Sequence, residues 1–264
     1  GIVRPIPVLM YHHVAPHPGD MVTVTPATFE GQMRYLATNG YAALSLDELL
    51  SAIRREWTPP GKAVAITFDD GWLDNWACAF PVLVKYRLRA AVFVATGWVD
   101  RASAEGPPVS PAAFPPHREA RRMAERGECR GVVVDWDRIA EMRASGLVDF
   151  YSHTASHAAC DRLEPDAAAE ELRSSKRALE ERLGCPCPYL CWPFGKFSEG
   201  TVALARESGY RALFTTRPGI VREGTDPFDI PRIVVKDRVD WFRIRARLYT
   251  RPWLSSLYLA AKKA

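Results

Sequence analysis

The chain has 264 residues, of which 47% are hydrophobic and 25% are charged. This length and composition predict a globular protein with one large α/β domain and a substantial core. No apolar run is long enough to cross a membrane, and we expect no signal peptide at the start of the sequence. The net charge of +4 is modest, so we expect no nucleic-acid partner.

Strand and helix signals alternate along the chain. Apolar, β-branched and aromatic runs predict strands at 7–11, 63–68, 90–95, 148–152, 189–192, 212–215 and 233–235, with a weaker one at 41–44. Amphipathic segments between them predict helices at 25–39, 45–53, 76–84, 135–146, 165–184 and 198–209. Such alternation implies a parallel sheet, either closed as a barrel or doubly wound.

Residues 101–134 interrupt this alternation. The stretch contains a cluster of prolines followed by charged residues, so it predicts an inserted loop with one short helix at 117–127. Long insertions often border binding clefts, and a plain solvated loop is the alternative.

The segment 241–264 interleaves basic and aromatic side chains. The simpler interpretation is a C-terminal helix that packs its aromatic side chains on the body of the protein. The alternative is a peripheral contact with an anionic membrane surface.

The six cysteines show no spacing typical of a zinc knuckle or a disulfide framework. Free thiols in a reducing compartment are the simpler interpretation. Together with the basic tail, they favour a cytoplasmic, membrane-peripheral protein. A periplasmic or extracellular location is the alternative if a leader has been removed.

Polar residues follow four of the predicted strands. His12 follows the first, Asp69 and Asp70 follow the strand at 63–68, His153 follows the strand at 148–152, and residues 193–195 follow the strand at 189–192. The carboxyl ends of parallel strands share one face, and in α/β folds that face holds the active site. We therefore expect these residues to lie close together.

One aspartate with two histidines four residues apart would form a three-ligand metal site. Taken alone, the aspartate pair could be a turn or a helix cap, and the histidine pair a capping residue and a surface residue. Together, Asp70, His153 and His157 suit Zn²⁺, Co²⁺, Ni²⁺ or Fe²⁺, with Zn²⁺ the default for hydrolysis. Asp69 is then free to act as a base.

These motifs also carry a family resemblance. Residues 67–71 and 153–157 resemble the first two motifs of the polysaccharide deacetylases, which are carbohydrate esterase family four and contain the NodB-homology domain. Residues 192–195 resemble the third motif, and the opening at 8–14 resembles the branch of poly-N-acetylglucosamine deacetylases. The resemblance implies a distorted (β/α)₇ barrel that is circularly permuted. It covers residues 5–235, so we expect a catalytic domain at 1–240 and a tail at 241–264.

The resemblance also implies roles for individual residues. Asp70, His153 and His157 match the metal ligands and Asp69 matches the catalytic base. The backbone N–H near Phe194 would stabilise the oxyanion of the tetrahedral intermediate.

The sequence departs from the family pattern at two places. Cys191 stands where many members have the arginine that orients the base, and Arg232 is our candidate substitute; a surface or core-edge salt bridge is its alternative role. No histidine follows His157, so the general acid must come from elsewhere. We assign it to His12, by analogy with the permuted branch, and place His13 second. Two further histidines are interpreted as surface residues of loops: His17 and His117.

The expected function is removal of N-acetyl groups from an N-acetylated sugar, with release of acetate. The sugar would be poly-N-acetylglucosamine, another exopolysaccharide, or a lipid-linked or lipopolysaccharide precursor. The alternatives are an O-acetyl esterase, a non-catalytic carbohydrate-binding barrel and a non-haem iron oxygenase, although the spare carboxylate of Asp69 argues against the last. Four tryptophans are candidates for stacking on sugar rings, with core packing the simpler interpretation: Trp72, Trp98, Trp136 and Trp192.

Overall fold

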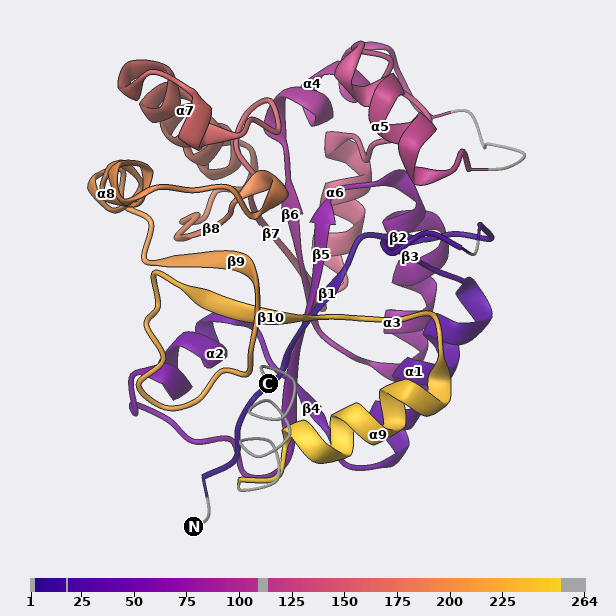
Figure 1. Ribbon diagram of the computed structural model, residues 1–264. Helices are drawn as coiled ribbons and strands as arrows, with labels where there is room; N and C mark the ends of the chain where they lie inside the picture. Colours follow the sequence, from indigo (N-terminus) through magenta and orange to yellow (C-terminus); the bar gives the residue numbers. More distant parts are fainter. Residues whose placement is uncertain (1–2, 18, 109–113, 253–264) are drawn as a thin grey trace.

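The computed structural model describes residues 3–17, 19–108 and 114–252, which form an α/β fold with a parallel sheet and helices packed outside it (Figure 1). The strands are β1 (Val8–Tyr11), β2 (His13–Val14), β3 (Thr23–Val24), β4 (Ala42–Ala43), β5 (Ala63–Asp70), β6 (Ala90–Val94), β7 (Val148–Ser152), β8 (Tyr189–Cys191), β9 (Ala212–Pro218) and β10 (Ile230–Val234). The helices are α1 (Pro26–Thr38), α2 (Leu46–Ile53), α3 (Phe80–Tyr86), α4 (Thr96–Ala104), α5 (His117–Glu125), α6 (Trp136–Ala144), α7 (Pro165–Leu183), α8 (Glu199–Glu207) and α9 (Val239–Tyr249). Three shorter helical segments are η1 (Asn75–Ala79), η2 (Cys160–Arg162) and η3 (Pro193–Gly195).

The main sheet has eight strands in the order β1-β10-β9-β8-β7-β6-β5-β4, and its pairings are parallel. Strand β1 pairs with β10 on one side and with β5 on the other. Tyr11 lies opposite Phe68 and Asp70 lies opposite Val94, so these strands end at one face. Strands β2 and β3 form a separate parallel pair near that face.

The sheet is covered on both sides. Every residue of β5 and β6 is buried, which explains why both read as continuous apolar runs rather than as alternating ones. Helix α1 turns Phe29, Met33 and Leu36 to the core, where all three side chains are fully buried. The strands therefore form a rigid base from which the residues at their carboxyl ends project.

Most predicted elements are present, with four differences. The segment predicted as a helix at 76–84 is the π-helical turn η1 followed by α3, and β10 begins at Ile230, so that Arg232 lies within the strand rather than before it. The short pair β2–β3 and the helix α4 have no counterpart in the prediction. Two-residue strands leave no periodic signal, and α4 begins immediately after a strand without a capping residue.

The insertion at 101–134 is not a plain solvated loop. It contains α5 at the predicted place, and Ala120 and Ala124 of that helix are buried. Its last residues run beside the turn that follows β5: the N–H of Leu73 donates to the carbonyl of Val132 (2.8 Å), and the N–H of Val134 donates to that of Gly71 (3.0 Å). The insertion is thus tied to the turn that follows the adjacent aspartates.

Helix α9 forms the described part of the predicted C-terminal segment. Trp241, Phe242 and Tyr249 are buried against the body, as the packing interpretation requires. The remainder of the segment, 253–264, lies outside the described residues, so the predicted membrane contact there is not tested. Among the helices of the described ranges, none combines the length and the apolar character needed to cross a membrane.

The start of α4 packs directly on the loop after β7, which carries the two predicted histidine ligands. The N–H of Thr96 donates to the carbonyl of Thr154 (3.2 Å), and the N–H of Gly97 donates to that of Ala155 (2.7 Å). A Cβ atom at Gly97 would lie 2.7 Å from the Ala155 oxygen, well inside normal contact. The glycine is therefore needed for the close approach of the two backbones.

We predict that Gly97→Ala lowers the free energy of unfolding by about 1–3 kcal/mol, because the loop after β7 must move. The same displacement should weaken binding of Zn²⁺ to the histidines of that loop. Urea unfolding and calorimetric titration with Zn²⁺ would measure the two effects. Gly200→Ala in α8 is the control, since its new methyl group would meet its nearest neighbour at an ordinary 3.8 Å. Equal effects of the two substitutions would contradict the proposed constraint.

Candidate active site

A buried ion pair joins the end of β5 to the middle of β10. Arg232 is fully buried and contacts both carboxylate oxygens of Asp69, from Nη1 to Oδ1 at 2.6 Å and from Nη2 to Oδ2 at 2.7 Å. Its Nε donates to the carbonyl of Thr215 (2.8 Å), and Nη1 also lies 3.2 Å from the hydroxyl of Thr67. Arg232 therefore holds the carboxylate of Asp69 in one orientation.

This pairing keeps Asp69 ionised. Burial by itself would raise the pKa of the carboxyl, but the charge and hydrogen bonds of Arg232 outweigh burial and lower the pKa below its ordinary value. Asp69 is thus a buried carboxylate that stays charged at neutral pH.

The neighbouring carboxylate, Asp70, faces two histidines. Its Oδ1 lies 3.1 Å from Nε2 of His153 and 2.9 Å from Nε2 of His157. Its Oδ2 accepts a hydrogen bond from the indole N–H of Trp72 (3.0 Å). The structure therefore brings together the three residues that the sequence predicts as metal ligands.

Neighbouring groups orient both imidazoles. Nδ1 of His153 donates to the carbonyl oxygen of Cys191 (2.7 Å), so Nε2 is the nitrogen that faces Oδ1 of Asp70. The ring of His157 stacks on Trp98 with centroids 4.7 Å apart, and its edge faces Phe194, also at 4.7 Å.

Glu171 of α7 anchors the same loop. Its carboxylate accepts hydrogen bonds from the backbone N–H groups of Ala155 (2.8 Å) and Ser156 (2.9 Å) and from the Ser156 hydroxyl. The sequence analysis missed Glu171, because its place on a charged helix gives no sign of this role.

The backbone at the site is held in an uncommon conformation. Asp70, Thr154, His157 and Phe194 have φ values of 81°, 68°, 59° and 60°, in the left-handed region that non-glycine residues rarely adopt. Such residues persist where the surrounding contacts determine the conformation, and they concentrate at functional sites. Three of these four are predicted site residues, so the strain lies at the cleft.

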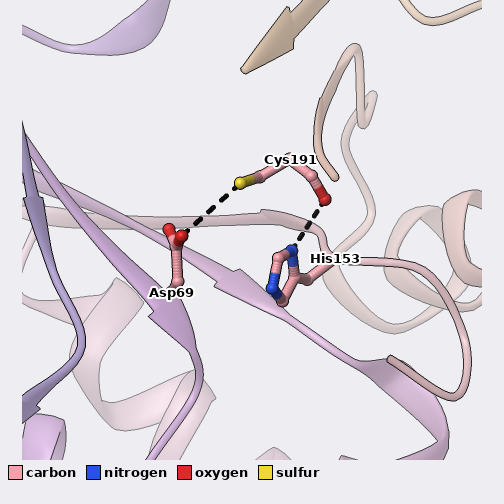
Figure 2. A group of neighbouring side chains, drawn as sticks. All are labelled: Asp69, His153 and Cys191. Carbon is pink, nitrogen blue, oxygen red and sulfur yellow. Dashed lines mark hydrogen bonds between the residues drawn. The ribbon is translucent and has the colours of Figure 1, made fainter. Parts of the chain in front are cut away.

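Two groups of donor atoms in the described part of the chain are close enough to hold a cation: Asp70 with His153 and His157, and Asp69 with His153 and Cys191. Figure 2 shows that the second group is already committed to hydrogen bonds, with the Cys191 thiol directed at Asp69 (3.6 Å) and its carbonyl at His153. The guanidinium of Arg232 also lies 3.0 Å from the Cys191 sulfur. A metal ion would be repelled by that positive charge, so only the first group fits a divalent cation.

His12 also lies beside Asp69, with its Nε2 3.7 Å from Oδ2 of that carboxylate. Burial of the imidazole lowers the pKa of His12, although Asp69 and Asp70 oppose the shift. His12 lines the same cavity as Asp69 and the three predicted metal ligands. The first-choice candidate for the acid is therefore placed within the cleft.

His13 points to a different set of partners. Its Nδ1 lies 2.6 Å from Asp74, its Nε2 lies 2.9 Å from Nδ1 of His117, and its ring stacks on Trp72. The interpretation of His117 as a surface loop residue is therefore wrong, since it begins α5 and lines the cleft. His17 is half-buried and bonds to the carbonyl of Phe114, outside the cleft. The sequence could not place His117, because the insertion that carries it has no strand-end position.

The cleft itself is small, about 170 Å³, with Trp98, Phe194 and Arg121 among its lining residues. Trp72 and Trp192 are almost fully buried, which favours the packing interpretation for both rings. Trp136 lies outside the cleft and donates its indole N–H to Asp100. Phe194 is the most accessible aromatic residue of the wall, at 41% exposure, and the guanidinium of Arg121 lies 4.4 Å from its ring centre.

Comparisons with known proteins agree on one class. The family model described as polysaccharide deacetylase matches residues 57–213, more than half of the chain. The chain therefore belongs to the polysaccharide deacetylase family, whose named relatives include N-deacetylases, hydrolases of carbon–nitrogen bonds.

Individual relatives are distant in sequence. YxkH of Bacillus subtilis, named as a polysaccharide deacetylase, is 26% identical over 87% of this chain and 71% of its own length. The poly-β-1,6-N-acetyl-D-glucosamine N-deacetylase of Escherichia coli is 23% identical over 86% of this chain, which spans only 36% of that protein. The structure of the Streptococcus pyogenes deacetylase PplD, in complex with acetate, has a TM-score of 0.75 and 26% identity over 91% of this chain and 96% of its own.

We predict that Arg232→Met lowers the free energy of unfolding by about 3–5 kcal/mol at pH 7, because it leaves the Asp69 carboxylate buried without a counter-ion. The wild-type pair stabilises the fold above the pKa of unfolded aspartate, about 3.9, and this contribution is lost as pH falls through the lowered native value. Urea unfolding between pH 7 and pH 3 would follow both effects.

Arg217→Met is the control, because Arg217 forms an exposed pair with Asp229 (3.2 Å) and should contribute no more than about 1 kcal/mol. The double variant Asp69→Asn/Arg232→Met should recover part of the lost stability. Similar losses of unfolding free energy for Arg217→Met and Arg232→Met would contradict the conclusion that burial makes the Asp69–Arg232 pair more important for stability.

Proposed function

We propose that this protein is a metal-dependent hydrolase that removes N-acetyl groups from an N-acetylated polysaccharide and releases acetate. One observation carries the proposal. At the carboxyl ends of the strands, an ionised carboxylate oriented by Arg232 stands beside three converging donors, Asp70, His153 and His157. Family membership supports the same reaction class.

The three donors suit a divalent cation, and we propose Zn²⁺ as the physiological metal, with Co²⁺, Ni²⁺ and Fe²⁺ as alternatives. When bound, such a cation would polarise the acetamide carbonyl and lower the pKa of water. The Nδ1–H of His153 is bonded to a backbone carbonyl and Trp72 holds the second oxygen of Asp70. The ligands are therefore oriented before the cation arrives.

We propose that Asp69 is the general base that takes the proton from the attacking water. Its pKa is low, so the carboxylate is ionised whenever substrate arrives. Arg232 positions the carboxylate by donating a hydrogen bond to each of its two oxygens. Arg232, on β10, then takes the role of the arginine that many family members have at the position of Cys191.

We propose that His12 is the general acid that protonates the departing amine. An unprotonated amine is a very poor leaving group, so a proton donor is needed on the side of the cleft facing the leaving nitrogen. His12 lines the cleft, and its lowered pKa makes the imidazolium a stronger acid. The backbone N–H of Phe194 is our candidate for oxyanion stabilisation, since this residue also lines the cleft.

For the substrate, we propose a poly-N-acetylglucosamine-like glycan, on the basis of relatives named as deacetylases of that polymer. A related exopolysaccharide or a lipid-linked precursor would carry the same acetamide. We further propose that residues 1–240 form the catalytic domain as a circularly permuted, distorted (β/α)₇ barrel. The pairing of β1 with both β5 and β10 supports that closure.

The adjacent aspartates allow a matched test of the two roles. Chelation should abolish acetate release from β-1,6-linked N-acetylglucosamine oligomers, and Zn²⁺ should restore it. Asp69→Asn should keep Zn²⁺ binding and lose about 10²–10⁴ in kcat, as expected for a general base. Asp70→Asn should lose Zn²⁺ binding itself, measured by calorimetry.

Two results would contradict this assignment. One is full activity of Asp69→Asn, and the other is activity that is indifferent to chelation. Acetate release from acetylated xylan, but not from the amino-sugar oligomers, would instead identify an O-acetyl esterase.

The pH dependence tests His12. The acid must be protonated, and burial places its pKa below the ordinary histidine value of about 6.5. We therefore predict that kcat/KM declines on the alkaline side as pH rises through that pKa. His12→Gln should lower activity by about 10²–10⁴ and remove this decline. His17→Gln, outside the cleft, is the control and should keep the wild-type profile. A variant at position 12 that retains the alkaline decline would rule out this histidine as the acid.

A further inference from the structure

A second, strongly cationic hollow lies in the part of the chain that the structure describes. It encloses about 460 Å³, and five basic side chains line it: Arg4, Lys62, Arg243, Arg247 and Arg251. No carboxylate is among its described lining residues. Every charged side chain among these lining residues is therefore positive.

This hollow lies at the end of the sheet opposite to the cleft. Arg4 and Lys62 precede β1 and β5, whereas Asp69 and Asp70 form the end of β5. Figure 1 shows α1, α9 and β4 at the lower end of the molecule and α4 and α5 at the upper end. Of the five basic residues, only Lys62 falls within the range matched by the family model. The hollow is thus separate from the deacetylase site and from the motifs of the family.

Three of the cations form a stripe along α9 and its end. Arg243 and Arg247 are four residues apart, which places them on the same side of α9, and Arg251, beyond the end of the helix, lines the same hollow. None of them forms an ion pair with a carboxylate among the described residues, and neither does Arg4 or Lys62. Like charges at this spacing disfavour a helix.

A buried tyrosine also lines the hollow. Tyr41 lines it and is only 6% exposed, yet its hydroxyl has no hydrogen-bond partner among the described residues. Burial raises the pKa of Tyr41 to about 12, so the phenol keeps its proton and can donate a hydrogen bond. The phenol of Tyr41 is therefore a further hydrogen-bond donor in the wall of the hollow.

We propose that this hollow binds an anion with two or more phosphoryl charges, such as a diphosphate group. Four guanidinium groups offer planar pairs of donors, the geometry that phosphate oxygens accept best. A single carboxylate would leave most of the five cations unneutralised. The proposal does not rest on the deacetylase function, because no residue of the hollow belongs to the cleft.

Calorimetric titration of the full chain with inorganic diphosphate at low salt tests this proposal. Arg243→Gln/Arg247→Gln should weaken binding at least tenfold, and Tyr41→Phe, which removes only the hydroxyl, should weaken it several-fold. Arg173→Gln/Arg177→Gln on α7 removes the same charge at the same spacing from another exposed face and should leave the affinity unchanged. Affinity should also fall as salt is added, since the attraction is electrostatic.

Diphosphate can also bind a divalent cation at the catalytic end, so the titration is repeated with Asp70→Asn. Unchanged affinity in that variant supports the hollow as the site. Loss of binding there would overturn the proposal, as would equal weakening by both arginine pairs or absence of binding to the wild type.

The source of the phosphoryl groups is tested separately. Co-sedimentation with phosphatidylcholine vesicles in which roughly one lipid in ten is cardiolipin, whose headgroup carries two phosphates, reports an anionic headgroup. Vesicle binding that Arg243→Gln/Arg247→Gln abolishes supports a lipid source. Diphosphate binding without vesicle binding supports a soluble ligand.

Discussion

The ion pair between Asp69 and Arg232 is the constraint on which the rest of the site depends. Burying a charge is unfavourable unless its partner satisfies it, and here both carboxylate oxygens are matched by one guanidinium. Because Arg232 lies in β10 and also bonds to Thr215 of β9, the pair ties both strands to the carboxyl end of β5. The geometry of the cleft therefore depends on how these strands pack in the sheet.

The same pair divides the work between two adjacent aspartates. Although the two residues are adjacent and line the same cleft, their carboxylates have different hydrogen-bond partners. Asp69 faces the arginine, and Asp70, with its left-handed backbone, faces the histidines. Arg232 thereby excludes a cation from the group that includes Cys191 and leaves the Asp70 group as the site that fits one.

The insertion at 101–134 completes the cleft from outside the sheet. It brings His117 against His13 and Arg121 over the ring of Phe194, two contacts that no strand end supplies. At the opposite end of the sheet, every charged side chain among the described residues that line the hollow is basic. The molecule thus separates a cleft rich in carboxylates and imidazoles from a purely cationic surface, with the length of the strands between them.

The strands and the grouping of Asp70 with His153 and His157 were predictable because their signals are local. The apolar run before Asp69 and Asp70 and the spacing of His153 and His157 identify a strand end and a pair of imidazoles without further information. The sequence did not determine the partner of Asp69. Arg232 lies 163 positions away, and a surface or core-edge salt bridge was its alternative role. The sequence also misplaced His117 and gave no sign of Glu171. These assignments depend on which distant segments meet, and that is decided by the register of the strands and the packing of the insertion, neither of which leaves a periodic pattern in the chain.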